Sequence, residues 1–132
     1  LVVINSSSEM LTSFINYNNH NLNSRAMNPL LEPMGIRFIL GSAGSDNTAF
    51  STAEHPLTAN ASYLTLTRYN EVGFRMDEGL VLYSAVSKRP LAGLVDYGEG
   101  QVLVIAERGM LMDSSARNLE FVMNLARYAA ER

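Results

Sequence analysis

The segment from Tyr97 to Ile105 constrains the fold of this chain more than any other. Glycines at 98 and 100 mark a tight turn, and an unbroken apolar run follows, Val102-Leu103-Val104-Ile105. A run that is apolar and mostly β-branched is typical of a strand that is buried on both faces. Because such strands lie inside the sheets of α/β proteins, the segment predicts that fold class.

The size and composition of the chain predict one domain, residues 1–132, with a core of ordinary size. Its 132 residues are 47% apolar and 17% charged, and the net charge is −3. The basic residues are scattered along the sequence, which argues against nucleic acid as a partner. No apolar run approaches the roughly 20 residues that a membrane span needs. The absence of cysteine excludes disulfides, thiolate metal sites and a cysteine nucleophile, and leaves the compartment undetermined.

Local patterns predict the elements of the first two thirds of the chain. The predictions are a short helix around Met10–Ile15, a polar loop at 17–25, a helix at Asn28–Pro33, a strand at Ile36–Leu40, a surface loop at Gly41–Ala53 and an edge strand at Ser62–Tyr69. Leu1–Ile4 has the pattern of a buried parallel strand, and such a strand needs neighbours and a crossover helix. The expectation is therefore that the chain is a cut, processed or partly resolved portion of a longer domain.

The last third is expected to contain two strands and a helix after a strand at Leu80–Val86. The strands Leu91–Asp96 and Gln101–Ala106 flank the tight turn, so they predict an antiparallel hairpin. The helix is predicted over Ser114–Glu131, with Asp113 as its N-cap. Its core face is predicted from helical spacing as Leu119, Val122, Met123, Ala126 and Ala130, widened by Phe121, Leu125 and Tyr128. Truncation of Leu119 or Val122 is then expected to cost roughly 2–4 kcal/mol.

Three short motifs occur in an order known from one protein family. They are Asn-Pro-Leu-Leu-Glu-Pro-Met-Gly-Ile-Arg-Phe at 28–38, His-Pro-Leu-Thr at 55–58, and the turn, strand and helix of 97–132, with Asn118 near the start of the helix. In this order they resemble the glutamine-amidotransferase-like domains. The resemblance implies a flavodoxin-like α/β fold, with a mostly parallel sheet flanked by helices and an antiparallel hairpin near the C-terminus. It also implies that the amino-terminal strand and helix of the domain lie upstream of Leu1. Catalytic members use a cysteine nucleophile, so the resemblance implies a non-catalytic member here.

Five residues are candidates for a ligand site. His55 could act as a general base or metal ligand oriented by Glu54, and the alternative is a turn in which His55 caps a backbone group. Glu107, Arg108 and Asp113 follow the last predicted strand, at the carboxyl edge where open α/β sheets bind ligands. If the fold brings Glu54 and His55 to the same edge, the set could hold a cation or a polar ligand. The alternative is an ion pair of Arg108 with one of the acids.

These observations predict a non-catalytic binding or assembly module of a larger protein. The expected partner is the upstream part of the same protein or a separate protein, and a polar small molecule or carbohydrate is a further possible ligand. The alternative is a hydrolase or carbohydrate-active domain that uses the acidic and histidine residues at the sheet edge. No cofactor, metal centre or catalytic residue is assigned.

Overall fold

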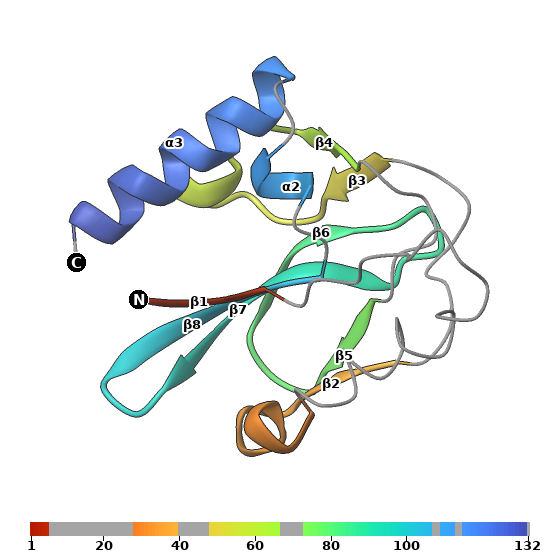
Figure 1. Ribbon diagram of the computed structural model, residues 1–132, viewed down its shortest axis with the longest axis vertical. Helices are drawn as coiled ribbons and strands as arrows, with labels where there is room; N and C mark the ends of the chain where they lie inside the picture. The colour runs from red at the N-terminus through yellow and green to blue at the C-terminus, as the bar shows by residue number, and fades with distance from the viewer. Residues whose placement is uncertain (6–27, 40–47, 67–72, 107–108, 113–114, 132) are drawn as a thin grey trace.

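A computed structural model of the protein describes residues 1–5, 28–39, 48–66, 73–106, 109–112 and 115–131 (Figure 1). The helix predicted around Met10–Ile15 and the loop at 17–25 lie outside these residues. The central sheet has six strands in the order β1-β8-β7-β6-β3-β4. Their bounds are β1 Val2–Asn5, β3 Thr48–Ser51, β4 Tyr63–Thr65, β6 Leu80–Ser84, β7 Pro90–Tyr97 and β8 Gly100–Ile105.

The sheet is mostly antiparallel, so the prediction of a mostly parallel, flavodoxin-like α/β fold is wrong. Among the described strands, only β1 and β8 pair in parallel, with Val2 opposite Val102, and the other pairings are antiparallel. The reason lies in the connections, because parallel neighbours need a crossover of about a dozen residues or more. Here residues 85–89 join β6 to β7, and residues 98–99 join β7 to β8. The sheets therefore curl into a half-barrel with few short helices.

The hairpin of β7 and β8 is confirmed. Tyr97 pairs with Gly100 across a turn in which Gly98 has a φ of 61°, a conformation that favours glycine. The strand β8 lies between β7 and β1, and its residues 102–105 are all buried. The apolar run thus marks a central strand, as predicted, although the sheet around it is antiparallel on one side.

Other predicted strands are confirmed in part. The strand β4 lies at an edge of the sheet and alternates as expected, with Leu64 buried and Tyr63 exposed. The segment Leu1–Ile4 does form a parallel strand, but it is also at an edge, and Val2 is 57% exposed. The predicted loop Gly41–Ala53 is wrong at its end, because Thr48–Ser51 forms β3 and buries Ala49. This strand is too short for its alternation to stand out in the sequence.

A second, two-stranded sheet and the C-terminal helix lie on opposite sides of the central sheet (Figure 1). The small sheet pairs β2, Ile36–Phe38, with β5, Phe74–Met76. It follows a helical segment at residues 28–31 that continues into the 3-10 turn η2, Glu32–Met34, and ends at Gly35 with a φ of 71°. The predicted helix and the strand after it are confirmed here.

The closing helix α3, Ala116–Ala130, confirms the predicted helix but only part of its predicted core face, since Phe121 is buried and Leu125 and Tyr128 pack against the core. Ser115 occupies the N-cap position, and the proposed cap Asp113 lies outside the described residues. A short helix α2, Gly109–Met112, and a 3-10 turn η3, Pro56–Thr58, lie beside α3. The buried residues of α3 are Asn118, Phe121 and Asn124. The predicted core residues Leu119 and Met123 are each 51% exposed, so the helix is rotated relative to the expectation.

Candidate functional site

His55 caps the short helical turn η3. Its backbone is extended, and its ring Nδ1 accepts a hydrogen bond of 3.1 Å from the backbone N–H of Leu57. Thr58 completes a capping box, because its hydroxyl oxygen accepts a bond of 3.2 Å from the backbone N–H of His55. Pro56 fits the first position of this turn, where no N–H is needed. The capping interpretation of the His-Pro motif is therefore confirmed.

The ring of His55 also contacts α3. It lies 5.3 Å from the ring of Tyr128, measured between centroids, with a tilt of 58°. The Tyr128 hydroxyl is 2.5 Å from Gln101 Oε1, so it donates a hydrogen bond to β8. Because Nδ1 of His55 accepts the Leu57 N–H, that nitrogen carries no proton in this arrangement. These contacts give the imidazole a structural role between η3, α3 and the sheet.

A shallow, open depression of about 950 Å³ lies over this turn. Its lining includes Glu54, His55 and Arg117, together with the hydroxyl groups of Ser51, Thr52, Thr58 and Ser62. Arg117 stacks over the Tyr63 ring, with its guanidinium carbon 4.1 Å from the ring centroid. The depression thus presents one charge of each sign on a surface open to solvent, while the hydroxyl groups of Ser51, Thr52 and Thr58 donate hydrogen bonds to backbone carbonyls.

The structure brings together only part of the predicted ligand site. Glu54 and His55 line the depression, Glu54 with an exposed side chain. Glu107, Arg108 and Asp113 lie outside the described residues, so their place in the site stays a prediction. Within the part of the chain that the structure describes, no three His, Asp or Glu residues are grouped as a metal would require. Likewise, none of the described helices is long and apolar enough to cross a membrane.

Asn118 on the inner face of α3 binds the edge strand β4, an interaction that the sequence analysis missed. Its Oδ1 accepts the backbone N–H of Thr65 at 2.8 Å, and its Nδ2 donates to the carbonyl of Thr65 at 2.9 Å. Nδ2 also lies 3.2 Å from the carbonyl oxygen of Gly109. The amide group therefore replaces the peptide of a neighbouring strand and satisfies both polar groups of Thr65.

Asn124 and Asn28 act in the same way elsewhere. Asn124 Nδ2 donates to the carbonyl oxygens of Leu57 at 3.2 Å and Ala59 at 2.8 Å, which fixes η3 against α3. Asn28 accepts the N–H of Phe38 at 2.7 Å and donates to its carbonyl at 3.3 Å, at the end of β2. The only sequence signal for Asn118 and Asn124 was that these two asparagines lie at helical spacing on either side of Phe121.

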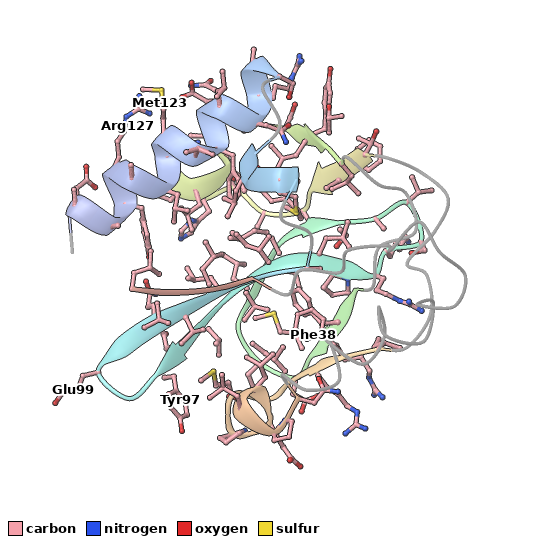
Figure 2. The ribbon with its side chains drawn as sticks, in the orientation of Figure 1. Phe38, Tyr97, Glu99, Met123 and Arg127 are labelled. Atoms are coloured by element: carbon pink, nitrogen blue, oxygen red, sulfur yellow. The ribbon has the colours of Figure 1, made fainter. Side chains whose placement is uncertain are left out.

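The opposite side of α3 carries an exposed apolar stripe. Its members are Ala116, Leu119, Met123, Ala126 and Ala130, and all five are exposed. Their spacing of alternate three and four residues is that of the a and d positions of a coiled coil. Figure 2 shows Met123 and Arg127 on the side of α3 that faces away from the sheet. We call these five residues the outer stripe.

Charged and apolar residues flank the outer stripe on its two sides. One flank carries Glu120, next to Leu119, and Arg127, next to Ala126. These two side chains form an ion pair, with 3.4 Å between Glu120 Oε1 and Arg127 Nη1. Val122 and Ala129 precede Met123 and Ala130, on the other flank. The outer surface of α3 is thus apolar along its centre and on one flank, and charged on the other.

Comparisons of the chain with protein-family models, with curated proteins and with solved structures gave no match. The resemblance to glutamine-amidotransferase-like domains thus stays a prediction that rests on three short motifs. Its flavodoxin-like sheet is corrected by the fold described above.

Proposed function

We propose that this chain is a non-catalytic assembly module that docks another polypeptide on the outer stripe of α3. The observation that carries the proposal is the exposure of Leu119 and Met123 at coiled-coil spacing, half of each side chain being in contact with solvent. Single exposed leucines are common on protein surfaces. Five aligned apolar residues along one helix form a continuous surface, and such surfaces commonly bind a partner.

The fold of the domain does not depend on the outer stripe. The inner face of α3 is held by Phe121, which is fully buried, and by the hydrogen bonds of Asn118 and Asn124. An outer face that served only as a solvated surface would favour charged and polar residues. The apolar residues of the stripe are therefore available for an intermolecular contact.

The alternative, a hydrolase or carbohydrate-active domain, has less support. It would use the depression that Glu54 and His55 line. A general base must accept a proton on a ring nitrogen, and Nδ1 of His55 already accepts the N–H of Leu57. Proton transfer through that nitrogen would cost the cap of η3, whereas docking on α3 leaves every described hydrogen bond in place.

Methionine oxidation tests the proposed docking surface. We would treat the assembly purified from its own source, and the isolated chain, with dilute hydrogen peroxide and measure Met123 sulfoxide by mass spectrometry. Docking on the outer stripe should slow the oxidation of Met123 several-fold in the native assembly. Equal rates in the two preparations would contradict the proposal.

A matched pair of variants sharpens this test. Leu119→Lys places a charge in the middle of the outer stripe and should remove the protection of Met123. Val86→Lys changes a residue that is 60% exposed in the turn between β6 and β7, away from α3, and should leave the protection intact. A loss of protection in both variants would point to a general loss of structure instead of a specific docking contact.

A further inference from the structure

We infer that the polypeptide that docks on the outer stripe is a second copy of this chain, with its α3 antiparallel to the first. The inference rests on the proposed assembly function and names its partner. A two-fold axis through the middle of the stripe would bring the same surface of both copies together, as in most homodimers. Three features of α3 support this arrangement: the order of large and small residues, the charges on one flank and the apolar residues on the other.

Large and small residues follow one another along the stripe in an order that fits a second stripe running in the opposite direction. Leu119 and Met123 are large and lie in the first half of α3, whereas Ala126 and Ala130 are small and lie in the second half. In an antiparallel pair, Leu119 faces Ala130 of the second copy and Met123 faces its Ala126. A parallel pair would instead place large against large and leave a gap between the alanines. Close packing thus favours the antiparallel pair.

The charges on the flank of the stripe fit the same axis. In antiparallel helix pairs the flank next to the d positions faces the same flank of the other helix. Glu120 of each copy then faces Arg127 of the other, and the contact occurs twice. The side chains of Arg127 and Glu120 are 56% and 32% exposed, so both can reach a neighbour. The guanidinium group has five N–H donors and can bind both carboxylates.

The second flank adds an apolar contact. Under the same axis, Val122 of each copy faces Ala129 of the other, again a larger residue against a smaller one. All three sets of contacts therefore follow from one position of the axis, between residues 124 and 125. Neither Glu120 with Arg127 nor Val122 with Ala129 would meet in a parallel pair.

The length of the helix sets the expected strength of the dimer. α3 has 15 residues and is therefore about 22 Å long. A pair of helices of this length buries less than the roughly 800 Å² per partner of a standard stable interface. The dimer should therefore form reversibly and depend on concentration.

Cysteine cross-linking tests the antiparallel register directly, because the chain has no cysteine of its own. Leu119→Cys mixed with Ala130→Cys should form a disulfide between two different chains under mild oxidation. Neither variant alone should do so, since two copies of residue 119 would lie about 16 Å apart along the axis. Disulfides in each variant alone, with no disulfide between residue 119 and residue 130 in the mixture, would show a parallel pair and overturn the inference.

Sedimentation velocity with charge reversals separates this inference from the proposed function. The wild-type chain should dimerise, Glu120→Arg should raise the dissociation constant roughly tenfold, and the double variant Glu120→Arg with Arg127→Glu should restore it. Circular dichroism would confirm that each variant folds. A chain that stays monomeric at millimolar concentration overturns the second copy as partner. Protection of Met123 in the native assembly would then still support docking on α3, whereas its absence would overturn both.

Discussion

The inner and outer faces of α3 each combine apolar and polar residues, unlike the faces of a simple amphipathic helix. The inner face buries two asparagines, Asn118 and Asn124, on either side of Phe121. The outer face exposes Leu119 and Met123 to solvent. A helix of this kind is oriented by specific hydrogen bonds to its neighbours together with the packing of Phe121, Leu125 and Tyr128 against the core. The comparison teaches that the inner face sets the orientation of the helix, and that the apolar outer face remains exposed to solvent.

The largest effect on stability is expected at Phe121, in the middle of the inner face. Its ring packs edge-to-face on the buried ring of Tyr83, with centroids 5.3 Å apart. Phe121→Ala should lower the free energy of unfolding by about 3–5 kcal/mol, because it leaves a cavity in the core. Urea denaturation measures the change. A loss below about 1 kcal/mol would contradict the assignment of the inner face.

A smaller loss is expected at Asn118. Asn118→Leu removes the amide that binds both backbone groups of Thr65, and should cost about 2–3 kcal/mol because buried polar groups lose their partners. Hydrogen exchange of the Thr65 amide should become faster. Asn118→Asp is the matched control, since it keeps an acceptor for the Thr65 N–H and should protect that amide better. Unchanged exchange in the leucine variant would show that Asn118 does not hold the edge of β4.

Tyr83, the residue on which Phe121 packs, is buried, and its burial predicts that the free energy of unfolding depends on pH. Burial raises the pKa of the Tyr83 phenol, whose hydroxyl donates to the carbonyl of Ala61 at 2.7 Å. The phenol of the unfolded chain ionises near pH 10, so the folded state holds this proton at pH values where the unfolded chain loses it. The stabilisation is full below about pH 10 and is lost as the pH rises toward the folded pKa.

The measurement compares Tyr83→Phe with wild type by urea denaturation at several pH values. At pH 7 the variant should be less stable by about 1 kcal/mol, the value of a typical buried hydrogen bond. Above about pH 10 the difference in free energy of unfolding between wild type and the variant should narrow by up to about 1.4 kcal/mol per pH unit. A gap that is constant between pH 8 and 11 would contradict the buried state of the phenol.

The smallest effect on stability is expected on the outer face. An inward-facing Leu119 would lose roughly 2–4 kcal/mol on truncation. Because the side chain is 51% exposed, Leu119→Ala should cost less than about 1 kcal/mol when measured on dilute, monomeric protein. A loss as large as that of Phe121→Ala would reverse the comparison of the two faces.

Much of the secondary structure could be predicted from local patterns. The turn at 97–100, the buried strand after it and the closing helix follow from residues that are close in the sequence. The topology could not be predicted from a buried strand alone, since β8 is buried with a parallel neighbour on one side and an antiparallel one on the other. The short connections around β7 were the better guide to pairing, because they leave no room for crossover helices.

The candidate site was predicted only in part. The His-Pro-Leu-Thr motif predicted either a functional histidine or a cap, and the positions of the Leu57 N–H and the Thr58 hydroxyl decide for the cap. The exposure of the outer stripe could not be predicted, because helical spacing identifies an apolar stripe without saying whether it is buried in the domain. Asn118 and Asn124 broke the apolar pattern and were therefore not assigned to the core.

The sequence by itself determined the existence of the helix, its length and the spacing of its apolar residues, because these depend on local propensity and on a period of 3.6 residues. Only the tertiary structure decided which face is buried. The edge strand β4 and the turn η3 present backbone groups that need partners, and asparagine amides on α3 supply them. Leaving a buried backbone group without a hydrogen-bond partner raises the free energy of the folded state more than leaving leucine and methionine side chains half exposed does. The asparagine hydrogen bonds and the buried ring of Phe121 together fix which face of α3 is turned inward.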